Sequence, residues 1–194
     1  MKKIALLLVF LFIFTLMFTL MPRPSEARQG FAVGMGPVGN IYLIDTIPVM
    51  DPGVGGHFFF DYRFQEQIAF ETTFMISSQS GTSVSGGDNG ILFLGMPTMD
   101  IKFYLLKNDP RFDPFVSTGV GVYWLTEGSI SNSTGGVGLG AQIGVGFDYY
   151  LTDPISVGFA GVFRSIGLIT NFGTPSASTA IFPYSLMGNI AFHF

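Results

Sequence analysis

The chain has 194 residues, a formal net charge of −4 and no cysteine, which excludes disulfide bonds and thiol chemistry. It is 48% hydrophobic and only 11% charged, whereas soluble globular domains carry about 25% charged residues. Beyond the first segment, no stretch approaches the roughly 18 apolar residues that a membrane-spanning helix needs. The composition therefore argues against both an ordinary soluble globular protein and a helical membrane protein.

Residues 1–27 have the pattern of a secretory signal peptide. Two lysines precede an apolar core over residues 4–21, and Ser25 and Ala27 form the small-x-small pattern that signal peptidase accepts. We therefore expect cleavage after Ala27 and a single domain over residues 28–194. The alternative is an uncleaved membrane anchor, because the apolar core is long. Cleavage removes three of nine basic residues and one of thirteen acidic residues, which leaves a net charge of −6.

Eight segments of the remaining chain alternate apolar residues with small or polar ones, which indicates β-strands with unlike faces. In chain order they are residues 30–36, 54–62, 67–77, 90–106, 112–125, 136–150, 155–164 and 179–194. The clearest is GVGLGAQIGVGFDYY (136–150), in which valine, leucine, isoleucine and phenylalanine alternate mainly with glycine. A helix is disfavoured there because each interior glycine costs a helix about 1 kcal/mol. The first segment, 30–36, has the least clear pattern.

The connections between these segments alternate in length. Short turns are predicted at 63–66, 107–111 and 151–154, and longer loops rich in Gly, Ser, Asn and Pro at 37–53, 78–89, 126–135 and 166–178. Short periplasmic turns that alternate with longer outer loops are typical of outer-membrane barrels. A soluble barrel of the lipocalin type would turn its apolar face inward. The sequence predicts an all-β fold, namely an eight-stranded antiparallel up-and-down transmembrane β-barrel.

Three stretches resemble the family of small outer-membrane β-barrel proteins, which contains OmpW and the OmpA-type transmembrane domain. They are GMPTMDIKFYLL (95–106), RFDPFVSTGVGVYW (111–124) and GAQIGVGFDYYLTDPISVGFAGVFR (140–164). At the C-terminus, the alternating Ile190, Phe192 and Phe194 resemble the sorting signal that the barrel-assembly machinery reads. The resemblance implies a place in the outer membrane of a Gram-negative bacterium, surrounded by its lipid. It also implies that periplasmic chaperones and the barrel-assembly machinery bind the chain during export.

Charged side chains on the inward face are the first candidate site. By the alternation, the inward charged residues are Asp61, Glu71, Asp100, Lys102, Asp148 and Arg164. Because a charge in a narrow, partly dry interior has to be paired or hydrated, we expect Lys102 and Arg164 to serve several of the four carboxylates. Such a network is either a polar plug that holds the barrel shut or an ion-pair gate, which the resemblance to the OmpA-type domain implies.

Inward glycines on three consecutive strands are the second candidate feature. They are Gly119, Gly121, Gly138, Gly140, Gly144, Gly146 and Gly158. They either make room for large inward side chains such as Phe59, Tyr104 and Tyr150, or leave a cavity. A cavity would suit passage of a small apolar molecule, as the resemblance to OmpW implies. Two functions therefore stay open: a narrow channel or conduit for small solutes, and a non-conducting structural or surface-interaction barrel.

Other functional classes find little support in the sequence. The acidic residues of the predicted outer loops are Asp45, Asp51, Asp88 and Glu127, and these loops contain no Lys or Arg. Basic surfaces for nucleic acid or lipopolysaccharide phosphates are therefore missing. His57, with serines in the neighbouring loop, makes a catalytic site conceivable, but a lone histidine more often serves as a polar lumen residue, so no enzyme is expected. Because His193 is the only other histidine and the chain has no cysteine, we expect no metal site and no cofactor.

Overall fold

The computed structural model describes residues 29–43, 51–82, 88–106, 111–127, 134–170 and 179–194. The predicted signal peptide and its cleavage site lie outside the described residues. The strands are β1 Gly30–Tyr42, β2 Gly53–Gln65, β3 Ile68–Thr82, β4 Asp88–Tyr104, β5 Phe112–Glu127, β6 Thr134–Thr152, β7 Ile155–Thr170, β8 Thr179–Ile181 and β9 Pro183–His193. In the described ranges, no helix is long and apolar enough to cross a membrane.

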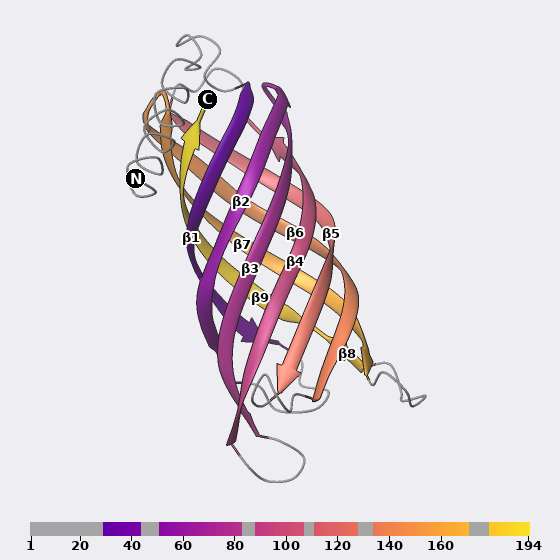
Figure 1. Cartoon of the computed structure of the whole chain (residues 1–194). Helices are drawn as coiled ribbons and strands as arrows, with labels where there is room; N and C mark the ends of the chain where they lie inside the picture. The colour runs from indigo at the N-terminus through magenta and orange to yellow at the C-terminus, as the bar shows by residue number, and fades with distance from the viewer. Residues whose placement is uncertain (1–28, 44–50, 83–87, 107–110, 128–133, 171–178) are drawn as a thin grey trace, which may run out of the picture.

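The strands form one closed sheet. Successive strands pair antiparallel, β1 also pairs with β9, and the pairing of β6 with β7 completes the ring (Figure 1). β8 and β9 are two parts of a single strand interrupted at Phe182, since both pair with β7. The predicted eight-stranded antiparallel up-and-down barrel is therefore confirmed. A closed sheet has no free edge, so each strand finds backbone partners on both sides.

The two faces of the wall differ as the alternation predicted. On β6, Leu139, Ile143 and Val145 are 68%, 60% and 59% exposed on the outer surface, whereas Gln142 and Asp148 are buried in the lumen. An outer wall of exposed apolar side chains is unfavourable in water but suits the hydrocarbon of a bilayer. The barrel is thus built for lipid outside and for packed side chains inside.

The strands are longer than the sequence indicated. β1 continues to Tyr42, and β3, β5 and β7 run on to Thr82, Glu127 and Thr170, into segments predicted as loops. The prediction ended β1 and β3 where apolar residues gave way to Gly, Ser and Pro, and it placed Ile166 and Leu168 of β7 in a loop. Pairing continues there, as between Ser80 and Gly90, because backbone hydrogen bonds need no apolar side chain. The outer connections are correspondingly shorter than expected.

The turn after β2 also differs from the prediction, and the difference bears on the lumen. The short connection was expected at 63–66, but β2 continues to Gln65 and β3 begins at Ile68. Arg63 therefore keeps the alternation of its strand and points into the barrel, where it is 4% exposed. In Figure 1 this turn lies at the top, at the same end as the C-terminus.

Candidate functional site in the barrel lumen

Most of the predicted charged residues lie on one row that crosses the wall from strand to strand. Going from β2 to β7, the directly opposed residues are Asp61, Glu71, Asp100, Gly119, Gln142 and Arg164. Lys102 stands two residues beyond Asp100 on β4, diagonal to Glu71 across the β3–β4 pair. Diagonal neighbours remain within reach of long side chains. The register thus brings charges that are far apart in the sequence into one row across neighbouring strands.

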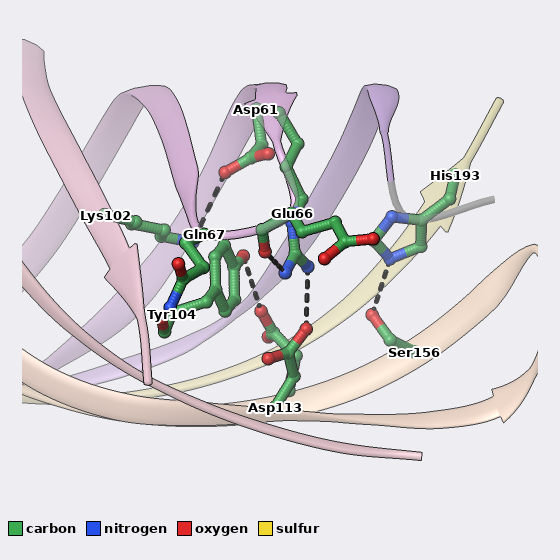
Figure 2. Close-up of polar contacts among 10 residues, drawn as sticks. Asp61, Glu66, Gln67, Lys102, Tyr104, Asp113, Ser156 and His193 are labelled. Atoms are coloured by element: carbon green, nitrogen blue, oxygen red, sulfur yellow. Dashed lines mark hydrogen bonds and ion pairs between the residues drawn. The ribbon is translucent and has the colours of Figure 1, made fainter. Parts of the chain in front are cut away.

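Lys102 binds two carboxylates of neighbouring strands. Its Nζ forms an ion pair with Glu71. It also lies 3.6 Å from Asp61 Oδ2, as Figure 2 shows. The rings of Phe115 and Phe59 flank the ammonium, with centroids 4.6 Å and 5.3 Å from Nζ. An ammonium enclosed by aromatic faces and carboxylates is held by both kinds of contact and shielded from water.

Arg164 does not pair directly with a carboxylate of the described residues, contrary to expectation. Its Nε donates to Gln142 Oε1 at 2.9 Å, and Gln142 Nε2 donates to Asp100 Oδ2 at 2.5 Å. Tyr123 Oη donates to the same Gln142 oxygen at 2.7 Å. Gly119 stands between Asp100 and Gln142 in the row, and without a side chain there it lets the two residues meet. The amide of Gln142 therefore links the cation to the anion.

From Arg164 the hydrogen bonds continue around the opposite wall. Arg164 donates to Ser185 on β9, Ser185 donates to Asn40 on β1, and Asn40 Nδ2 donates to Ser77 Oγ on β3 at 2.6 Å. We call this chain of six side chains the belt: Asp100, Gln142, Arg164, Ser185, Asn40 and Ser77. Each belt residue is 0–6% exposed. Six strands are thereby tied together across the lumen by buried hydrogen bonds, of which those of Arg164 and Asp100 are charge-assisted.

A second polar group closes the lumen at the short-turn end. Arg63 Nη1 lies 2.7 Å from Asp113 Oδ2, and its other amino group donates to the Glu66 carbonyl oxygen (Figure 2). Its guanidinium stacks 3.7 Å from the centre of the Tyr104 ring, and Tyr104 Oη donates to Asp148 Oδ2 at 3.1 Å. Sequence reasoning missed Arg63 and Asp113. The alternation along β2 would have placed Arg63 inside, had the turn after β2 been set two residues later. Asp113 lies within the predicted strand 112–125, where the alternation already turns it to the same side as Gly119.

The outer half of the lumen contains a buried apolar cluster, which the sequence did not predict. We call this group the outer apolar cluster; its buried members are Met75, Ile91, Phe93, Tyr123, Ile166, Leu168 and Ile181. Phe93 and Tyr123 stack with their ring centres 5.7 Å apart. The sequence did not reveal this cluster because β4 carries apolar residues on both faces at residues 91–94, so the alternation did not distinguish the inward face from the outward one. The lumen therefore contains a hydrophobic cluster that adjoins the belt, where Ser77 stands opposite Phe93.

The inward glycines make room for large side chains rather than leave an open passage. A Cβ added at Gly121 would lie 2.9 Å from the Tyr123 ring, one at Gly140 2.8 Å from Ile166, and one at Gly146 2.7 Å from Phe115. The remaining predicted glycines face other occupants: Gly119 faces Asp100, Gly138 faces Leu168, Gly144 faces Ser117, and Gly158 faces Asp148 and Asn189. Of the two interpretations, the geometry agrees with room for packing.

The cavity that the described residues enclose in the lumen is small. A cavity beside the row offers about 30 Å³, room for about two water molecules. Glu71, Asp100, Lys102 and Arg164 line it, with the hydroxyls of Thr73, Thr98 and Ser117 and the His57 ring among other wall residues. In the part of the chain that the structure describes, no group of three or more His, Cys, Asp or Glu is arranged to hold a metal ion.

The two histidines lie apart. His57 is buried in the lumen and stacks on Phe59, with ring centres 6.0 Å apart. His193 lies near the end of β9, where its Nε2 is 2.8 Å from Ser156 Oγ and its ring packs on Tyr150 (Figure 2). Ser156 is fully buried, so this hydrogen bond is enclosed at the short-turn end.

The C-terminal residues of the predicted assembly signal lie on the outer surface. Ile190 is 53% exposed, and the rings of Phe192 and Phe194 pack 5.1 Å apart, edge to face. Their recognition by the assembly machinery stays a prediction.

A closed antiparallel barrel with an apolar outer wall and a lumen filled by side chains defines a transmembrane barrel of the outer-membrane type. The chain belongs to the family described as outer membrane protein beta-barrel domain, whose model matches residues 10–180. No match is found among the curated proteins. The family and the fold point to the bacterial outer membrane.

Solved structures show the same fold at low sequence identity. Neisserial surface protein A (NspA) superimposes with a TM-score of 0.62 at 11% identity, covering 86% of this chain and 98% of that one. The outer membrane protein OprG from Pseudomonas aeruginosa gives 0.57 at 14%, covering 86% and 97%. Ail, the attachment invasion locus protein of Yersinia pestis, gives 0.57 at 12%, covering 86% and 99%. At these identities the likeness concerns the fold alone.

Proposed function

We propose that the protein is a non-conducting outer-membrane barrel whose lumen serves as its structural core. One observation carries this proposal: two barriers of buried side chains, one apolar and one polar, block the lumen. The outer apolar cluster fills the half near the outer loops, and the belt with the Lys102 ion pairs crosses the middle. The cavity beside the belt is only about 30 Å³. A passing solute would have to displace both barriers.

The cost of opening such a lumen supports a structural role. Removing one partner of a buried ion pair costs about 3–5 kcal/mol, because the other charge stays uncompensated. Lys102 serves two carboxylates at once, and Arg63 pairs with Asp113 further along the lumen. A solute that moved these groups aside would break several buried ion pairs at once, and each broken pair would carry this cost. The same contacts stabilise the barrel when they are intact.

If the lumen has only a structural role, the outer loops are the part of such a barrel that can contact partners. Ail was solved in complex with the heparin analogue sucrose octasulfate. Heparin-like polyanions require basic residues, whereas the predicted outer loops of this chain contain acidic residues and no Lys or Arg. We therefore expect any surface partner of this protein to be neutral or basic rather than a sulfated glycan.

A narrow conduit for small solutes is the second candidate function. The observation that favours it is the polar cavity in the middle of the lumen, lined by Glu71, Asp100, Lys102 and Arg164. Rearranged ion pairs at this level would open a polar path, and the outer apolar cluster would have to move with them. This function requires a second conformation, whereas the structural role requires none.

Conductance across a planar bilayer distinguishes the two functions. The protein is refolded in detergent, its folding is checked by heat-modifiable gel mobility, and it is then inserted into the bilayer. We expect no single-channel events from the wild type. A Phe93→Ala, Ile166→Ala double variant thins the outer apolar cluster and serves as a sensitised control. Regular single-channel steps from the folded wild type would refute the structural role and support the conduit.

A further inference from the structure

The lumen holds more negative than positive charge. Its described Asp, Glu, Lys and Arg side chains are five carboxylates, Asp61, Glu71, Asp100, Asp113 and Asp148, and three bases, Arg63, Lys102 and Arg164. If all of them are ionised, two negative charges remain without a basic partner. Uncompensated charge in a closed interior is costly, and it is normally neutralised by a proton or by a bound cation.

One carboxylate oxygen of this set is left unused beside the cavity. Asp100 is 6% exposed, and its Oδ2 accepts the hydrogen bond of Gln142. Its Oδ1 is buried without a hydrogen-bond partner among the described residues. This oxygen lies over Gly119, close to where a Cβ of that residue would stand, and Asp100 lines the lumen cavity. The cavity therefore has a free anionic ligand on its wall.

Further oxygen ligands surround the same space. Thr73 Oγ1 donates its proton to Glu71 Oε1 at 3.0 Å, and Thr98 Oγ1 donates to the Thr73 carbonyl oxygen at 3.5 Å. Because each hydroxyl has one proton and two lone pairs, a hydroxyl that already donates presents only lone pairs to its other side. With Ser117, these residues line the cavity next to the two carboxylates. The wall can thus offer several oxygens to one small cation.

The basic side chains of the cavity wall are engaged elsewhere. Lys102 Nζ is held by Glu71 and Asp61 and lies against the Phe115 ring. The Arg164 donors go to Gln142, Ser185 and Met187. Neither cation is bonded to Asp100 Oδ1, so neither neutralises this oxygen through direct contact.

We propose that the cavity binds one small monovalent cation, with sodium as the best fit and Asp100 Oδ1 as its anchoring ligand. Carboxylate and hydroxyl oxygens are hard ligands, which suit sodium, magnesium or calcium rather than zinc or copper. Calcium takes about six to eight oxygens, and magnesium demands near-octahedral geometry with retained waters. The cavity offers two carboxylates, a few hydroxyls and about 30 Å³ of space. This set suits a monovalent ion better than a divalent one. The bound ion would neutralise part of the excess charge and tie the belt to the Lys102 pairs.

The test compares the thermal unfolding of the refolded barrel in sodium chloride and in choline chloride at equal ionic strength. Choline is too large for the cavity, and equal ionic strength holds general screening constant. At a hundredfold excess of sodium over its Kd, we expect the wild-type Tm to lie about 5 °C higher in sodium than in choline. Asp100→Asn should remove this difference. Asp113→Asn, which removes a buried carboxylate that pairs with Arg63, should keep it.

A second measurement keeps the proposal testable if Asp100→Asn does not refold. The sodium-23 line width of the wild type should broaden on addition of folded barrel and narrow again after unfolding. Equal Tm values in the two salts together with an unbroadened line would overturn the proposal and leave protons as the neutralising species. A sodium effect that persists in Asp100→Asn would also overturn it. So would stabilisation by millimolar calcium in place of sodium, because the ion would then be divalent.

Discussion

Lys102→Met removes the ammonium from the middle of the lumen while keeping most of the side-chain volume. Asp61 and Glu71 would then lose their common cation in a place where their side chains are only 8% and 13% exposed. Removing one partner of a buried ion pair costs about 3–5 kcal/mol. For a chain of this size, each kcal/mol lowers Tm by about 2–4 °C, so we expect Tm to fall by roughly 6–20 °C.

The assay is heat-modifiable gel mobility of the refolded barrel as a function of temperature, repeated as a urea titration. The exposed Asp153 in the turn between β6 and β7 provides the control, since Asp153→Asn removes a charge outside the lumen. A triple variant, Lys102→Met with Asp61→Asn and Glu71→Gln, removes the whole charge group and should recover most of the lost stability. If Lys102→Met stays within about 1 kcal/mol of the wild type, the ion pairs do not stabilise this lumen.

Two further substitutions test the glycine packing and the lipid-facing wall. Gly140→Val should lower the free energy of unfolding by about 1–3 kcal/mol through overpacking against Ile166 and Tyr123. Gly56→Ala, whose Cβ would meet only a backbone oxygen at 3.6 Å, is the matched control and should be close to neutral in the same urea titration. Ile143→Arg places a charge in the middle of the outer face of β6 and should cost about 2–4 kcal/mol in lipid vesicles. Equal stabilities of Gly140→Val and Gly56→Ala, or an unchanged Ile143→Arg barrel, would contradict this description.

Much of the fold could be predicted because the side-chain period of a strand is a local property. Alternate residues of a strand point to opposite faces, so the order of residues alone placed Gln142 and Asp148 inside and Ile143 outside. The strand ends were less predictable. Ser80 and Gly90 carry no apolar signal, yet they pair, because hairpin hydrogen bonds extend beyond the apolar part of each strand.

The sequence predicted most of the residues that form the candidate site, but only some of the contacts between them. The alternation of side chains along each strand identified Lys102 and Arg164 as lumen cations, but it predicted the same kind of contact for both. In the structure Lys102 reaches two carboxylates, whereas Arg164 reaches Asp100 only through the Gln142 amide. That difference depends on which residues of neighbouring strands stand opposite each other, and on the gap left by Gly119. Neither feature is visible within a single strand.

The sequence by itself determined the class of protein: a β-barrel with one apolar and one polar face, whose alternating short turns and longer loops indicate that the apolar face is turned toward lipid. Whether the lumen is open was decided by the tertiary structure alone. The inward glycines of β5 and β6 are equally compatible with a hole and with room for bulky neighbours. Closure of the sheet brings Tyr123, Phe115 and Ile166 over them. Because an eight-stranded barrel is just wide enough for side chains to fill it, the sizes and register of residues on different strands determine whether any space remains.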